Sequence, residues 1–196
     1  MNKFWQDRLE EHIDVIKDIS ADADLISLIN SIAQVIVHAY RTSSKLLVCG
    51  NGGSAADSQH LAAELVSRFF LERKALDAEA LTINTSSLTA IGNDYNFERV
   101  FSRQVEAKGK NGDILLGIST SGNSINVIEA IKTAKDIGIK TIGFTGSNKE
   151  SLISRLSDYC IYVPSGTTPR IQEAHILIGH ILCEFIENEL FGNKEI

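Results

Sequence analysis

The sequence predicts an α/β fold, a three-layer arrangement in which a five-stranded parallel sheet lies between helices and a helical arm precedes it. After residue 44, short apolar segments alternate with segments of helical periodicity. The connections are long enough for the crossover helices that parallel strands require. A length of 196 residues suits one domain with its own core. We therefore expect a single domain over 1–196, with helices in 1–44 and an α/β core in 45–196.

The first 44 residues predict two helices. Apolar side chains recur at roughly helical spacing from Phe4 to Ile19. The same spacing is stronger from Leu25 to Ala39. The pattern changes after Ser44, so this boundary separates a helical arm from the sheet rather than two independent domains.

The core is expected to alternate strands with helices. Short apolar runs predict strands at Leu46–Cys49, Ala80–Asn84, Ile114–Ile118, Thr141–Thr145 and Cys160–Val163. Helices between them are expected to begin near Ser54, Ser87, Ser124 and Lys149. A last helix is predicted from Pro169 to Leu190, with Thr168 as its N-cap and Pro169 in its first turn.

Composition narrows the class of protein. Hydrophobic residues make up 43% and charged residues 22%, as in ordinary globular proteins. A net charge of −6 argues against nucleic acid or an anionic membrane as the main partner. We find no signal peptide at the N-terminus and no segment near the ~20 apolar residues that span a bilayer. Cys49, Cys160 and Cys183 lie in apolar stretches without metal-like spacing, which predicts free buried thiols and a cytoplasmic protein.

Two polar loops follow predicted strands and open predicted helices. The first is Gly50-Asn51-Gly52-Gly53-Ser54, and the second is Ser119-Thr120-Ser121-Gly122-Asn123-Ser124. Both fall at the carboxyl edge of the sheet, where ligands of such folds bind. Unpaired N–H groups at a helix N-terminus, with glycines and hydroxyls nearby, can hold a phosphate.

The loops also have simpler explanations. Ser54 with Asp57 fits a helix-capping arrangement, and capping alone can account for Ser54. The second loop carries more hydroxyls than one cap needs, although a solvated turn remains its alternative. Neither loop has the Walker or the Gly-x-Gly-x-x-Gly pattern, so a sugar phosphate is favoured over a nucleotide.

A His-Glu pair follows the first loop. His60 and Glu64 are four residues apart on the predicted helix, so they share one face. An exposed ion pair is the ordinary explanation, but the first turns of this helix lie nearest to any ligand held by the loop. The pair is therefore a candidate for the site.

The last predicted helix carries a second polar set within an apolar sequence: Gln172, Glu173, His175, His180 and Glu184. Apolar neighbours of His180 predict that it points into the protein, and a core histidine without chemistry is the alternative. Together, His60, Glu64, Gln172 and His180 can supply nitrogen and oxygen ligands to zinc. They can equally supply a general base and a general acid, and the residues alone leave both roles open.

These residues resemble the sugar isomerase (SIS) domain family, and within it the phosphoheptose isomerases. The resemblance covers almost the whole chain. It rests on Cys49–Ser54, His60-x-x-x-Glu64, Gly92-Asn93-Asp94, Leu115–Ser124, Arg170-Ile171-Gln172-Glu173-x-His175 and His180.

The resemblance implies a flavodoxin-like fold assembled as a homotetramer, with active sites between subunits. It implies isomerisation of sedoheptulose 7-phosphate to D-glycero-D-manno-heptose 7-phosphate, an early step toward nucleotide-activated heptose. Glu64 and His180 would be the catalytic proton-transfer pair. One zinc per subunit would be bound by His60, Glu64, Gln172 and His180. The implied substrate-binding residues are Asn51, Gly52, Gly53, Ser54, Asn93, Asp94, Ser119, Thr120, Ser121, Ser124 and Gln172.

Two other functions compete. One is a non-catalytic relative of the same fold that associates with the bacterial replication initiator. It shares the Gly-Asn-Gly-Gly-Ser and Arg-Ile-Gln-Glu segments but lacks the acid–base pair that matches Glu64 and His180. The other is a different sugar-phosphate isomerase or sensor, which generally lacks the His60-x-x-x-Glu64 arrangement. The sequence favours the heptose isomerase.

Overall fold

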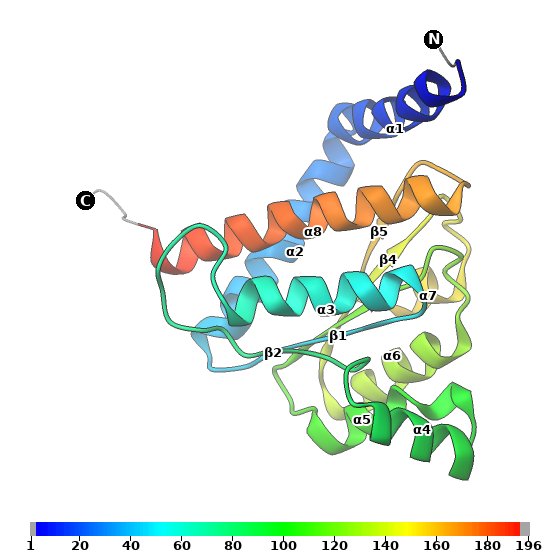
Figure 1. Ribbon diagram of the computed structural model, residues 1–196. Coiled ribbons are helices and arrows are strands. Elements are labelled where there is room, and N and C mark those ends of the chain that lie inside the picture. The colour runs from blue at the N-terminus through cyan, green and yellow to red at the C-terminus, as the bar shows by residue number, and fades with distance from the viewer. Residues whose placement is uncertain (1–2, 193–196) are drawn as a thin grey trace.

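The computed structural model describes residues 3–192 and confirms the helical arm. Helix α1 spans Lys3–Ala21 and α2 spans Ala23–Arg41. Asp22 separates them, and its side chain accepts a hydrogen bond from the Leu25 N–H at 2.9 Å. This cap ends one helix and starts the next, so the arm bends at a defined residue (Figure 1).

The sheet has five parallel strands in the order β2-β1-β3-β4-β5, which confirms the predicted architecture. Four strands lie within one residue of the predicted bounds. The strands are β1 Leu46–Gly50, β2 Ala78–Ala80, β3 Ile114–Ile118, β4 Lys140–Thr145 and β5 Tyr159–Tyr162.

The prediction for the second strand was wrong. The strand was expected at Ala80–Asn84, but β2 ends at Ala80. Asn84 instead caps α4, because its side chain accepts from the Ser87 N–H at 2.9 Å. The apolar run after Ala80 turns away from the sheet edge after one further ladder bond, from the Leu81 N–H to the Val48 carbonyl.

Helices cover both faces of the sheet. Alternate residues of β1 show the two faces, because Leu46 and Val48 join one apolar cluster while Leu47 and Cys49 join the other. Figure 1 shows α2, α3 and α8 on one side and α4, α5 and α6 on the other. The remaining elements are α3 Gly53–Val66, α4 Thr85–Asp94, η1 Phe97–Arg99, α5 Ser102–Lys108, α6 Ile125–Ile137, α7 Leu152–Leu156 and α8 Thr168–Phe191.

Helix starts differ from prediction in detail. Gly52 precedes α3 as its N-cap without a side-chain bond, so Ser54 is not the cap and lies buried in the first turn. Thr167, not Thr168, precedes α8. The short elements η1 and α5 were not predicted, because they are too brief to show a periodicity.

Helix α2 corrects one expectation about membranes. Over residues 23–41 it is long and apolar enough, by length and composition, to cross a bilayer. Its apolar face instead packs against α8 and β5 in the structure. The three cysteines are free and buried, as expected.

Candidate active site

The two predicted loops flank the point where the strand order reverses. Strands β1 and β3 are neighbours in the sheet. After β1 the chain crosses to β2 on one side of this pair, and after β3 it crosses to β4 on the other side. Ligands of open parallel sheets bind at this crevice, beyond the carboxyl ends of the strands. Asn51 follows β1 and Ser119 follows β3, so the loops are neighbours at this crevice.

The second loop gathers its hydroxyl groups. The Oγ atom of Ser119 lies 2.8 Å from that of Ser124 and 3.3 Å from that of Ser121. Gly122 has a φ of +67°, and a Cβ there would collide with the side chain of Ser151. Because only glycine fits this turn, the loop holds three hydroxyls beside the N-terminus of α6, an arrangement that suits an anion.

The first loop packs tightly against α8 and α6. A Cβ on Gly53 would lie 2.5 Å from the amide nitrogen of Gln172, so glycine lets the Gln172 amide rest against the loop in this position. Asn51 exchanges two side-chain hydrogen bonds with Asn126, at 2.8 and 2.9 Å. The loop is therefore held from two directions.

A cavity of about 250 Å³ opens at this edge of the sheet. Its walls include Thr120 and Ser121 from the second loop, as the sequence predicts. Sequence reasoning missed the polar residues after β4 and β5, although the same strand-end rule would have found them. The lining residues are Thr120, Ser121, Ser147, Asn148, Ser165, Gly166, Thr168 and Ile171.

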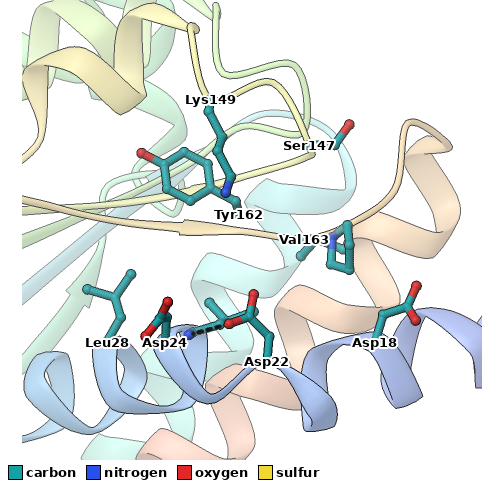
Figure 2. A pocket seen from close by; sticks show the side chains of 10 residues that line it. Asp18, Asp22, Asp24, Leu28, Ser147, Lys149, Tyr162 and Val163 are labelled. Atoms are coloured by element: carbon teal, nitrogen blue, oxygen red, sulfur yellow. Dashed lines mark hydrogen bonds between the residues drawn. The ribbon is translucent and has the colours of Figure 1, made fainter.

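A larger cavity of about 470 Å³ lies beside it, between the arm and the ends of β4 and β5. Figure 2 shows Asp18, Asp22 and Asp24 on the arm side, facing Lys149 and Tyr162. Three carboxylates against one lysine disfavour a phosphate dianion. The smaller, hydroxyl-lined cavity is therefore the better phosphate site.

His60, Glu64 and His180 converge on one point. The Nε2 atom of His60 lies 3.0 Å from Glu64 Oε1 and 3.1 Å from His180 Nε2. One ligand atom from each residue lies within 4.8 Å of the others. His180 is partly exposed and its ring faces His60 on α3, so the structure excludes the alternative of a core histidine.

Close helix packing brings these residues together. Gly179 precedes His180, and Leu61 follows His60. A Cβ on Gly179 would lie 2.5 Å from Leu61 Cδ2, so glycine lets α8 approach α3 at this level. The centre of the Phe69 ring lies 5.8 Å from that of the His180 ring, so Phe69 packs beside His180.

The cluster fits a divalent metal. An imidazole Nε2 atom offers either one proton or one lone pair, yet His60 Nε2 has two polar neighbours at hydrogen-bond distance. A bound cation would satisfy all three groups at once. Tetrahedral zinc, with bonds of about 2.0 to 2.2 Å, holds ligand atoms about 3.4 Å apart, close to the two distances from His60 Nε2.

Other predicted residues lie elsewhere in the chain. Gln172 precedes His180 by eight residues, about 12 Å along α8, and its amide rests on Gly53. One chain therefore does not gather all four predicted metal ligands. Asn93 donates to Asp94 at 2.9 Å at the end of α4, in the helical layer across the sheet (Figure 1).

Two further titratable groups lie on the same helices, His175 buried and Asp57 half-buried. His175 is the core histidine of α8, because it is 1% exposed and its Nε2 donates to the Thr145 carbonyl at 3.1 Å. Burial lowers the pKa of His175 to about 4, against the opposing effect of this bond. Asp57, one turn before His60, has a buried Oδ2 without a recorded partner, and burial raises its pKa against the charge of His60.

Comparisons with known proteins agree with this fold. The SIS domain family matches residues 10–146. Over 194 residues the chain is 54% identical to the phosphoheptose isomerase of Clostridium acetobutylicum, covering 99% of this chain and 98% of that protein. The phosphoheptose isomerase structure from Neisseria gonorrhoeae is 42% identical with a TM-score of 0.88, covering 95% of this chain and 98% of that one.

A second solved structure, a phosphoheptose isomerase from Francisella tularensis, has a TM-score of 0.90 at 35% identity and covers 96% of this chain and 100% of that one. The chain therefore belongs to the SIS domain family. Its relatives, matched along nearly their whole length, place it among the phosphoheptose isomerases of that family.

Proposed function

We propose that this protein is an aldose–ketose isomerase that converts sedoheptulose 7-phosphate to D-glycero-D-manno-heptose 7-phosphate. The observation that carries the proposal is the convergence of His60, Glu64 and His180. The helix α3 begins at the first loop, and α8 begins at Thr168 in the wall of the smaller cavity. The phosphoheptose isomerases to which the chain is similar support the choice of substrate.

The serine loop would bind the phosphate. The clustered hydroxyls of Ser119, Ser121 and Ser124, with Thr120 at the neighbouring cavity, offer donors without a full positive charge. The α6 N-terminus adds the favourable end of its dipole. In the first loop, Gly52, Gly53 and Ser54 would approach the sugar, together with Gln172. Asn93 and Asp94 are also proposed to contact the sugar. They are not part of the cluster that His60, Glu64 and His180 form in this chain.

Glu64 would move the proton between C1 and C2 of the open-chain sugar. Its carboxylate takes the proton from one carbon, leaving an enediolate, and returns it to the other carbon. His180 would donate to or accept from the sugar oxygens as the carbonyl moves from C2 to C1. The 3.0 Å contact with His60 holds the Glu64 carboxylate on the face of α3 that meets His180.

His60, Glu64 and His180 would also hold one zinc ion per subunit, with Gln172 as the fourth predicted ligand. Bound zinc would polarise the sugar oxygens and stabilise developing negative charge. Because Gln172 lies two turns from His180, its participation needs a shift in α8 or a contribution from a second copy of the chain.

Active sites between subunits of a homotetramer are part of the proposal. The His60 side chain is 48% exposed in the single chain, whereas an enediolate needs protection from water. Apolar side chains are exposed on α1 and α8, with Trp5, Leu9 and Ile181 each more than half exposed. A second copy covering these residues would bury apolar surface and close the site. We further propose that the enzyme works in the cytoplasm.

The replication-initiator alternative is not favoured, because the acid–base pair that its members lack is present here and converges in space. A coupled assay with purified protein and sedoheptulose 7-phosphate tests the function directly. Formation of the aldose phosphate supports it. Absence of turnover with this substrate, with added zinc and a confirmed fold, would overturn it, and capture of the initiator protein would then favour the alternative.

A further inference from the structure

The two loops predicted to hold substrate are joined by a reciprocal pair of amide hydrogen bonds. The Asn51 Nδ2 group donates to Asn126 Oδ1 at 2.9 Å. The Asn126 Nδ2 group donates back to Asn51 Oδ1 at 2.8 Å. Asn51 belongs to the loop after β1, and Asn126 is the second residue of α6, which the serine loop opens. The pair therefore bridges the crevice where the strand order reverses.

Asn126 is fixed within the fold. It is 4% exposed, and its Oδ1 also accepts from the Val127 N–H at 3.0 Å. Breaking the pair would remove the hydrogen bond of the buried Asn126 Nδ2 group, which is costly, while Oδ1 would keep its bond to Val127. The carboxamide of Asn51 is engaged once at its nitrogen and once at its oxygen, so Asn126 fixes its orientation and leaves one N–H and one lone pair of Asn51 available.

The loop that contains Asn51 needs a restraint on its position. Gly52 has a φ of +56° and adds conformational freedom at the residue that precedes α3. The Asn51 carbonyl accepts from the Ser54 N–H at 3.0 Å, and the Gly52 carbonyl accepts from the Ala55 N–H at 3.1 Å. These bonds order the turn internally, whereas the amide pair sets its position relative to the serine loop.

We infer that Asn126 is a positioning residue, which holds the sugar-binding loop through Asn51 at a fixed distance from the phosphate-binding loop. The inference rests on the proposed function for the identity of the ligand. It assigns Asn51 a role in holding the loop in place through its bonds with Asn126.

A double-mutant cycle tests this role. In the coupled assay, Asn51→Ala and Asn126→Ala should each lower kcat/KM about tenfold, and the double variant should be no worse than either single variant. Two residues that act only as a pair lose their whole effect when one is removed. Multiplicative losses, about hundredfold in the double variant, would show that Asn51 acts independently and would overturn the inference. Changes in melting temperature without any kinetic change would overturn it too.

Hydrogen exchange in the full-length protein without substrate gives a second readout. The N–H groups of Ser54 and Ala55 should exchange about tenfold faster in Asn126→Ala than in the wild type. Asn188→Ala, an exposed asparagine on α8, serves as the control and should leave these rates unchanged. Unchanged rates in Asn126→Ala would overturn the inference. Faster exchange in a protein whose wild type fails to turn over the heptose phosphate would refute the proposed function alone.

Discussion

The Nε2 atoms of His60 and His180 lie 3.1 Å apart, although 120 residues separate them in the chain. The contact joins α3, which leaves the first loop, to α8, which ends the fold (Figure 1). Glu64 completes the cluster from the next turn of α3. This arrangement places a carboxylate and two imidazoles together on α3, which follows the first loop, and α8, whose first residue lines the smaller cavity.

Replacing Glu64 with Gln should abolish turnover and leave sugar-phosphate binding. Glutamine has nearly the same shape but cannot take a proton from carbon, so kcat should fall about a thousandfold or more. Steady-state kinetics and titration calorimetry with sedoheptulose 7-phosphate measure the two effects. Glu184→Gln, an exposed change on α8, is the matched control. Full activity in Glu64→Gln would refute the assignment of Glu64 as the base.

Zinc binding should depend on the three converging side chains. Calorimetry with Zn²⁺ alone should show saturable binding to the wild type. His60→Ala should weaken it about a hundredfold, because one of three nitrogen or oxygen ligands is lost. His38→Ala removes a histidine from α2, outside the cluster, and is expected to bind Zn²⁺ like the wild type. Equal affinity in His60→Ala and the wild type would exclude the metal site.

A methyl group at Gly179 should separate the two helices of the site. In Gly179→Ala the new Cβ would lie 2.5 Å from Leu61 Cδ2, and Leu61 is buried, so the Leu61 side chain or one of the helices must move. We expect a loss of about 1 to 3 kcal/mol in the free energy of unfolding, with weaker zinc binding. Denaturant unfolding measures the first effect.

Gly92→Ala is the control for that substitution, because a Cβ there would meet only Val100, at 3.9 Å. It should leave the free energy of unfolding within about 1 kcal/mol of the wild type. If Gly179→Ala behaved like this control, close packing at Gly179 would not be what brings His180 to His60.

Glu187 should make folding stability fall in acid. Burial alone would raise its pKa, but the N–H groups of Phe69, Phe70 and Leu71 and the guanidinium of Arg73 lower it to about 2. Because the unfolded state binds a proton more readily, the stabilisation is present above about pH 4.5 and is lost as the pH falls toward 2. A lowering from 4.5 to about 2 corresponds to about 3 kcal/mol.

Glu187→Gln tests this dependence. It should unfold more readily than the wild type at pH 7, and the difference should shrink as the pH approaches 2. Urea unfolding at several pH values measures it. Arg73 also donates to the Glu64 carbonyl at 3.0 Å, so the variant should disturb the end of α3 as well. A difference in stability that stays constant from pH 7 to pH 2 would contradict the lowered pKa of Glu187.

Much of the fold follows from local sequence patterns. The apolar runs that form β1 and β3 are short and bounded by polar loops, so their bounds are visible without a structure. Strand β2 was misplaced because it has three residues at the sheet edge, too few to distinguish from the apolar turn that follows. The N-cap at Gly52 was also missed, since a glycine cap leaves no side-chain signature.

The candidate site divides in the same way. The spacing of His60 and Glu64 fixes their shared face, because a helix repeats every 3.6 residues. Such local patterns do not predict that His180 contacts His60. They also do not predict that Gln172 packs against Gly53, or that Asn51 pairs with Asn126.

The sequence by itself determined the alternating elements, the loops at the carboxyl edge and the His-x-x-x-Glu pair, because each depends on residues close together in the chain. The tertiary structure decided which face of α8 meets α3. That choice depends on close packing between distant segments, such as Gly179 against Leu61, and no local periodicity encodes it.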